Sequence, residues 1–282
     1  IEFNEFRDPD DQHSLEHLLQ ALTRVTSTYP GFIGEGSAEK LADPRAELMS
    51  LTSDVERQGS LRSLLRSFGY SAYIIRDILP VDAWRIVVNI HQNWNPKVSI
   101  SLIGSGRLLD SINKLLLQLS AFSGLNNDNM ARETDWLLLK IGRSLERALN
   151  LIALLRATLV PYYKPSMEAQ MFATVLSTSN SLITYRRRYR SFMQLPTILE
   201  LLLTDKNYPR ALAYQLHQLQ RMIAELPQDQ PSVETNIDGV LISEILSDLS
   251  SADLKQLAQL SQCDNCYPLL EELLNVQKVR LE

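Results

Sequence analysis

Apolar residues recur at the spacing of an α-helix along almost the whole of this 282-residue chain. Between residues 14 and 28 they stand at positions 15, 18, 19, 22 and 25, which places them on one stripe of a helix. Prolines separate such segments: Gly59 to Leu79 ends before Pro80, and Val81 to Trp94 ends before Pro96. Glycine and proline are otherwise scarce, which argues against the many hairpins of a β protein. The pattern predicts an all-α fold, a multi-helix bundle with long central helices.

The remaining helices are predicted from the same signals. We expect them at 105–125, 130–160, 167–193, 210–226, 238–262 and 267–281, with a short helix beginning at Pro196 and a glycine-rich loop at 31–36. The stretch 227–236 is polar and contains Pro227 and Pro231, so we expect a linker there. The predicted domains are therefore a main helical bundle over 1–227 and a C-terminal helical annex over 228–282.

Charge and composition exclude several classes of protein. The net charge of -5 argues against a general nucleic-acid binder, because neutralising phosphates needs a basic surface. No apolar run approaches the roughly 18 residues that span a membrane, and the polar start has no signal-peptide shape. Two cysteines cannot form a disulfide framework, so a cytoplasmic location is expected. Residue 1 is Ile rather than Met, from which we expect a piece of a longer protein.

Three short motifs carry no self-sufficient chemistry. Cys263 and Cys266 have CxxC spacing, but a structural zinc site would need a second pair of ligands. His13 and His17 are four residues apart without the glutamate that follows the first histidine in zinc proteases. The glycines at 31, 34 and 36 lack the spacing of a nucleotide-binding loop. We therefore expect no metal site and no cofactor in this chain.

The long helix predicted over 130–160 carries charge on an otherwise apolar background. Arg143, Glu146 and Asn150 fall on one side of it, with Arg147 adjacent. A helix that is apolar nearly all round is usually central, and buried charges must be paired. The group is therefore either a structural ion pair or part of a substrate site.

A second cluster, Tyr185 to Arg190, contains four arginines. Arg186 and Arg188 flank the apolar face on opposite sides, whereas Arg187 and Arg190 point outward, so the four cannot all enter one site. Arginine suits bidentate capture of carboxylate or phosphate. Aromatic residues beside basic ones also occur in RNA binders, although the net charge weighs against that partner. The alternative is that the four arginines form a solvent-exposed basic face that has no binding function.

Several ordered stretches resemble the signature of the bacterial alpha-E domain family. They are Trp136 to Ala148, Ser181 to Arg190 and Asn207 to Leu216, and upstream Ile75 to Asp77 and Asp82 to Trp84. The resemblance extends over about residues 15–227.

One feature of that family is missing from this chain. Its members usually open with a helix carrying an Arg-Tyr-x-Glu-Arg-Ala-Glu-like motif, which we do not find here. The resemblance is therefore to an N-terminally truncated member that lacks the first helix, and Glu146 lacks the glutamate that would be its partner.

The resemblance implies an all-α domain that is encoded beside, or fused behind, a circularly permuted ATP-grasp domain, with a transglutaminase-like peptidase nearby. Such ATP-grasp enzymes make amide bonds through an acyl phosphate, with ATP and Mg on the ATP-grasp domain. The implied function is that of a helical partner domain in an amide ligase system, and whether this chain is itself catalytic stays open. The alternative is a non-catalytic protein–protein interaction scaffold of unknown function.

The residues that would bind an anionic substrate or intermediate are arginines from two adjacent helices. Glu146 is the candidate catalytic residue, which would orient one arginine or bind the substrate amine, and Tyr185 or Tyr189 would close the pocket. The expected substrate-binding residues are Arg143, Arg147, Tyr185, Arg186, Arg187, Arg188, Arg190 and Arg210.

Overall fold

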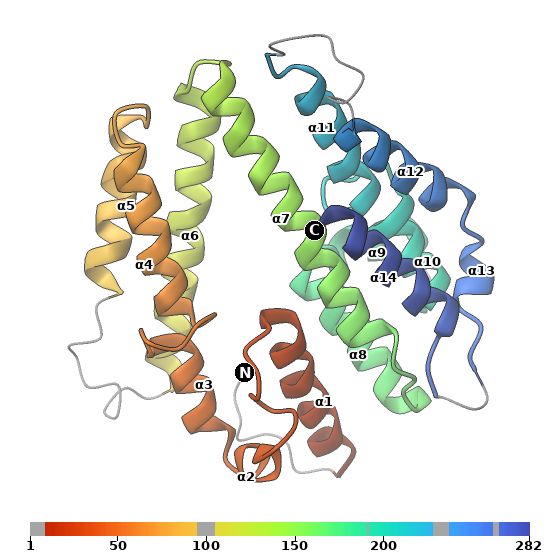
Figure 1. Cartoon of the computed structure of the whole chain (residues 1–282). Coiled ribbons are helices and arrows are strands. Elements are labelled where there is room, and N and C mark those ends of the chain that lie inside the picture. Colours follow the sequence, from red (N-terminus) through yellow and green to blue (C-terminus); the bar gives the residue numbers. More distant parts are fainter. Residues whose placement is uncertain (1–8, 95–104, 191, 228–236, 262–264) are drawn as a thin grey trace. The chain divides into compact units, whose positions relative to one another are not determined.

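Helices account for all the regular secondary structure in the residues described, apart from one isolated β-bridge between Pro161 and Cys266. The computed structural model describes residues 9–94, 105–190, 192–227, 237–261 and 265–282 (Figure 1). The predicted all-α, multi-helix fold is confirmed. None of the described helices combines the length and the apolar character that crossing a membrane requires.

The chain divides into two compact units, each with its own core. Unit 1 comprises residues 1–7 and 26–136, and unit 2 comprises residues 8–25 and 137–282. The predicted boundary at residue 227 falls inside unit 2. That the segment 228–282 forms a domain of its own stays a prediction.

Unit 1 is built on three helices, α4 (Leu61–Ile74), α5 (Val81–Asn93) and α6 (Ser105–Asn129), with α5 packed against both others. Ser60 caps α4, because its hydroxyl accepts a hydrogen bond from the backbone N–H of Ser63 at 3.1 Å. Leu65, Ile90 and Leu115, one from each helix, are buried together. This apolar layer fixes the order of the three helices.

Two further helices of unit 1 follow the glycine-rich loop and were not predicted from the sequence. They are α2 (Ser37–Ala42) and α3 (Pro44–Ser53). Asp43 caps α3 by accepting from the backbone N–H of Arg45, and Pro44 occupies the first turn, where a proline is tolerated.

Unit 2 surrounds the long helix α7 (Thr134–Leu159). Its other elements are α1 (Pro9–Thr26), α8 (Pro165–Thr178), α9 (Leu182–Tyr189), α10 (Leu195–Leu199), the π-helical turn η2 (Glu200–Thr204), α11 (Leu212–Ala224), α12 (Ile237–Ser251), α13 (Leu254–Leu257) and α14 (Pro268–Leu281). Fully buried side chains come from α7, α8, α10, η2, α11, α12 and α14. The C-terminal helices therefore share the core of this unit, with α12 packed against α11 and α14.

Two predicted helices are interrupted. The segment 167–193 is two helices, because Asn180 takes a left-handed conformation (φ 54°) between α8 and α9, and a second left-handed residue, Arg190, ends α9. The segment 238–262 breaks at Asp253, whose carboxylate accepts the backbone N–H groups of Lys255 and Gln256 and so caps α13. Conversely, residues 126–129, which lie between the predicted helices 105–125 and 130–160, form the last turn of α6.

Candidate functional site

The charged side of α7 consists of four residues at helical spacing. Arg143, Glu146, Arg147 and Asn150 stand at i, i+3, i+4 and i+7, so they share one face of the helix. Other faces carry the buried apolar residues that anchor α7 in unit 2, among them Ala148, Ile152 and Leu155. Burial of those apolar residues therefore fixes which way the charged face points.

This face lines a cavity of about 350 Å³ within unit 2. The cavity is bounded by α7, the C-terminal end of α8, the start of α11 with the turn before it, and the last turn of α1. The lining residues are Val25, Arg143, Glu146, Arg147, Asn150, Leu151, Leu154, Thr178, Ser179, Pro209, Arg210 and Gln215. Such a volume lies in the range of small-molecule sites, roughly 300–1,000 Å³.

Arg210 reaches the cavity from a turn that is held at several points. The amide of Gln215 donates to the carbonyl of Pro209 at 2.5 Å, and Gln215 is itself buried. The hydroxyl of Tyr208 donates to the Ser181 hydroxyl at 2.9 Å. These contacts hold the turn that leads into Arg210, so its position in the wall follows from packing rather than from the arginine itself.

The three arginines of the cavity act on one another. Partial burial lowers the pKa of Arg143, and the charge of Arg210 lowers it further. Partial burial also lowers the pKa of Arg147, as do the charges of Arg143 and Arg210. All three guanidinium groups remain charged, because arginine does not deprotonate in proteins. The wall therefore concentrates positive charge that an anion would neutralise.

No carboxylate of the described residues lies within 4 Å of these three guanidinium groups. Glu146, which lines the same cavity, instead accepts a hydrogen bond from the side-chain amide of Asn150 at 3.3 Å. Asn150 also donates to the backbone carbonyl of Glu146 at 2.8 Å. The ion pair between Arg143 and Glu146 that the sequence allows is not formed.

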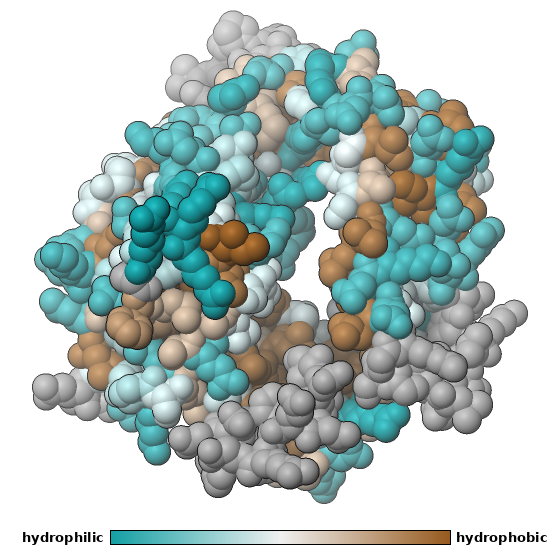
Figure 2. All heavy atoms as spheres, turned by 180° about the vertical axis from the view of Figure 1, so that it is seen from behind, coloured by the Kyte–Doolittle hydropathy of each residue, from teal (hydrophilic) through white to brown (hydrophobic). Residues whose placement is uncertain are grey.

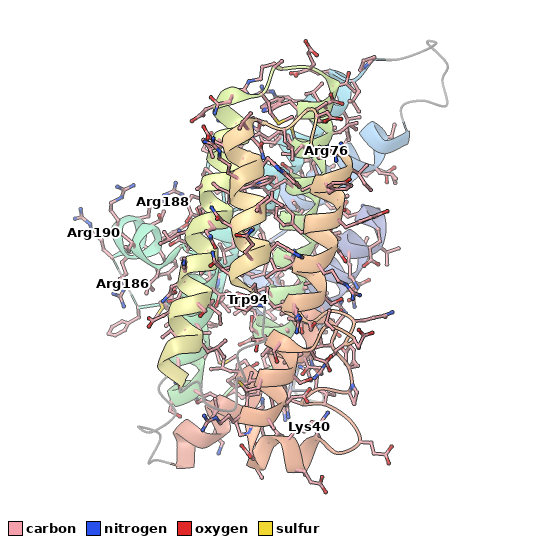
Figure 3. The ribbon with its side chains drawn as sticks, turned by 90° about the vertical axis from the view of Figure 1, so that its left-hand side faces the viewer. Lys40, Arg76, Trp94, Arg186, Arg188 and Arg190 are labelled. Carbon is pink, nitrogen blue, oxygen red and sulfur yellow. The ribbon has the colours of Figure 1, made fainter. Side chains whose placement is uncertain are left out.

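The arginines of α9 do not line this cavity. Arg186, Arg187 and Arg190 are exposed, and none of them forms an ion pair with a described residue. Figure 3 shows Arg186 and Arg190 pointing outward from the helix. Of the expected substrate-binding arginines, Arg143, Arg147 and Arg210 therefore line the cavity, whereas the four of α9 do not.

Arg188 has a different place from its neighbours. It pairs with Asp205, and its guanidinium lies over the ring of Tyr208, 5.5 Å from the centroid. Burial opposes ionisation of Asp205, but the hydrogen bond and charge of Arg188, together with the backbone N–H groups of Asn207 and Tyr208, outweigh burial and lower the pKa of that carboxyl. Asp205 also accepts the backbone N–H of Asn207 at 2.8 Å. Arg188 therefore supports the turn that carries Arg210.

Tyr185 lies in the core instead of closing a pocket. It is 1% exposed, its hydroxyl is 2.6 Å from the Thr197 hydroxyl, and it accepts the backbone N–H of Gln194. Its ring packs against that of Tyr189, with centroids 4.9 Å apart. Tyr189 is half-buried, and burial together with nearby Glu200 raises its pKa to about 12. Both tyrosines join α9 to the helices that follow it.

Gln215 and Ser179 line the cavity without having been singled out from the sequence. Gln215 falls within the stretch Asn207 to Leu216, and its place in that stretch is the one sequence feature that could have identified it as a site residue. Ser179 follows α8 at the break in the predicted 167–193 helix, so its position could not be read from helical periodicity.

The cysteine and histidine motifs for which no chemistry is expected can be described only in part. Among the described residues, no three His, Cys, Asp or Glu side chains gather as a metal site would require. Cys263 and the side chain of His13 lie outside the described residues. His17 makes an edge-to-face contact with Tyr163, at 5.2 Å between ring centroids.

Comparison with known families gives one match over nearly the whole chain. The Alpha-E model, described as a predicted α-helical domain with a conserved ER motif, matches residues 1–280. The chain contains Glu-Arg twice, at 56–57 and at 146–147. The second pair belongs to the cavity just described.

Two mycobacterial relatives are similar to this chain over 235 residues, at 32% identity. They are the uncharacterized protein Rv2567 of Mycobacterium tuberculosis and the uncharacterized protein Mb2597 of Mycobacterium bovis. The match covers 80% of this chain but 26% of each relative, so the chain spans about a quarter of their length. No solved structure matches the chain.

Proposed function

Because the chain belongs to the Alpha-E family, we propose that it is the helical partner domain of an ATP-grasp amide-bond-forming system. In this proposal the cavity on α7 binds an anionic substrate or intermediate of that system. The ATP-grasp partner supplies ATP and Mg, and this chain supplies Arg143, Arg147 and Arg210.

One observation supports the proposal most strongly. Three guanidinium groups line one cavity, and no carboxylate of the described residues pairs with them. Structural arginines at such density are normally neutralised by acidic partners, because like charges held together are unfavourable. Arginines that are held by packing and left without partners are suited to capture a carboxylate or phosphoryl group.

In this proposal Glu146 binds the amine end of the substrate. Its carboxylate is exposed at the same cavity and is held by Asn150 rather than by an arginine. A carboxylate in that position suits a substrate ammonium group, while the arginines hold the anionic end. An amide ligase needs both an anionic acyl intermediate and an amine.

The test is ADP release by the cognate ATP-grasp partner with a pool of amino acids and peptides. The reactions contain no helical chain, the wild-type chain, its Glu146→Gln form, or its Arg187→Ala form. The last is a matched control, because Arg187 is exposed on α9 and lies outside the cavity. We expect the wild-type chain and Arg187→Ala to stimulate turnover, and Glu146→Gln to lose the stimulation. Equal turnover in all four reactions would contradict the proposal.

The alternative function, a non-catalytic interaction scaffold, is favoured by exposed apolar side chains in unit 1. Tyr70 and Ile74, one turn apart on α4, are 68% and 62% exposed, and Val81 at the start of α5 is 68% exposed. On the face that Figure 2 shows, hydrophobic residues (brown) lie exposed among hydrophilic ones (teal). If Tyr70→Ser with Ile74→Ser abolishes complex formation with the ATP-grasp partner, and Arg147→Ala leaves turnover unchanged, the scaffold is the better account.

A further inference from the structure

The charge balance of the α7 cavity restricts what it can bind. Its described lining contains three arginines and one carboxylate, that of Glu146, so the fixed charges leave an excess of two positive charges. A ligand with a single negative charge neutralises half of this excess. A dianion neutralises all of it, which favours a doubly charged ligand.

The number of hydrogen-bond donors in the cavity also favours a doubly charged ligand. Each guanidinium presents a planar fork of N–H groups, and three arginines line one cavity. A carboxylate offers two oxygens to them, whereas a phosphoryl group offers three. A phosphoryl group can therefore engage Arg143, Arg147 and Arg210 with one oxygen each.

The remaining wall is apolar. Val25, Leu151, Leu154 and Pro209 line the cavity beside the arginines. Inorganic phosphate would leave this apolar surface and most of the 350 Å³ to water. An organic group joined to the phosphoryl end would cover it and gain from burial.

We infer that the ligand of this cavity is a small organic molecule ending in a phosphoryl dianion, a phosphate ester or an acyl phosphate, rather than a free carboxylate. The inference rests on the proposed function and names the class of its anionic ligand. Arg143, Arg147 and Arg210 hold the phosphoryl oxygens, the apolar wall covers the organic part, and Glu146 stays at the edge of the cavity.

The test compares two probes that differ in charge but little in shape. Methyl phosphate changes from monoanion to dianion around pH 6, so its dianionic fraction rises about tenfold between pH 5 and pH 7.5. Dimethyl phosphate stays a monoanion throughout. Calorimetric titration of the full chain at low salt should show methyl phosphate binding about tenfold more tightly at pH 7.5 than at pH 5, and dimethyl phosphate binding weakly at both. Sulfate, a dianion at both values, controls for changes in the protein itself and should bind equally.

Variants locate the binding and check that folding is intact. Arg210→Ala, in an exposed turn, and Arg147→Gln, on α7, should each weaken methyl phosphate binding at least tenfold. Arg187→Ala should bind as the wild-type chain does. Circular dichroism identifies any variant that has lost its fold, and the other variant then decides the outcome.

The failures of the two proposals are distinguishable. If acetate and dimethyl phosphate bind as tightly as methyl phosphate, and Arg210→Ala abolishes all three, the cavity is an anion site as proposed but the phosphoryl inference is overturned. If no anion binds, or if binding survives both cavity variants, the proposed anion site is contradicted, and the phosphoryl inference is contradicted with it.

Discussion

The hydroxyl of Tyr185 is a buried polar group with two partners, and its removal should cost stability without affecting ligands. The Thr197 hydroxyl donates its one proton to the carbonyl of Gln194, so Tyr185 is the donor in its 2.6 Å contact with Thr197. Tyr185→Phe also leaves the Gln194 N–H without its acceptor. We expect a loss of about 1–2 kcal/mol in the free energy of unfolding, measured in urea.

The control for this prediction is Tyr70→Phe, because Tyr70 is 68% exposed and its hydroxyl makes no hydrogen bond to a described residue. It should change stability little. Methyl phosphate binding by Tyr185→Phe should equal that of the wild-type chain. A Tyr185→Phe protein that keeps its stability but loses anion binding would return Tyr185 to the substrate site.

Glu47 makes the most buried ion pair of the described residues. It is 8% exposed, lies 2.5 Å from Arg57, and has Lys40 at 3.5 Å. Burial opposes its ionisation, but the hydrogen bond and charge of Arg57, with Lys40, outweigh burial and lower the pKa of Glu47. Glu47→Gln should therefore cost about 3 kcal/mol at pH 7, because Arg57 is left without its partner.

The lowered pKa of Glu47 sets the direction in which the stability difference changes with pH. A carboxyl whose pKa is lower in the folded state adds stability above its unfolded pKa, about 4.3, and loses it as pH falls through the folded value. The stability gap between wild type and Glu47→Gln, from urea titrations, should be full above about pH 5 and narrow below about pH 4. Glu56→Gln, an exposed neighbour, should show no such gap. A gap independent of pH would mean that the amide disturbs packing rather than charge.

Residue-level prediction from the sequence succeeded where one helix holds the whole pattern. Arg143, Glu146 and Arg147 share a face because of their spacing alone, and helical periodicity is local information. Arg210 could be predicted as a site residue only from the family resemblance, because its turn meets α7 through tertiary packing, which helical spacing does not reveal. The role of Arg188 was missed because its partner, Asp205, lies 17 residues away.

Among the elements, proline predicted the helix boundaries more reliably than polar residues did. α5 begins after Pro80 and α8 begins at Pro165, as proline geometry favours. The breaks at Asn180 and Asp253 were not predicted, because both residues are also tolerated inside helices. Asn180 shows its effect only in its left-handed backbone, and Asp253 only in the N–H groups it caps.

The C-terminal helices are predicted to unfold together with the rest of unit 2. Leu274 on α14 is fully buried, and Arg280 on the same helix lies 2.6 Å from Asp248 of α12. The backbone N–H of Tyr267 donates to the carbonyl of Val160, at the end of α7, at 3.0 Å. Leu274→Ala should therefore lower the free energy of unfolding of unit 2 by about 3 kcal/mol. It should also reduce the protection of backbone amides from hydrogen exchange to the same extent in α7 and in α14.

Hydrogen exchange read by mass spectrometry measures this shift segment by segment. Val279→Ala serves as the control, because Val279 is on the same helix but 74% exposed, and it should change stability by less than about 0.5 kcal/mol. If exchange quickens in residues 237–281 alone, the segment 228–282 is a separate domain, as the linker expected at 227–236 predicts.

At the scale of the whole molecule, the division into two units predicts two cooperative regions of unfolding. Leu65 belongs to the core of unit 1, and Leu155 is fully buried in unit 2. Because each unit has its own apolar core, removing three carbons from either should destabilise that unit by about 2–4 kcal/mol. Leu65→Ala should speed amide exchange in α4, α5 and α6 and leave α11 and α12 unchanged. Leu155→Ala should do the reverse. Equal acceleration in both regions by either variant would mean that the chain unfolds as one cooperative body, and that the cavity on α7 draws its stability from both cores.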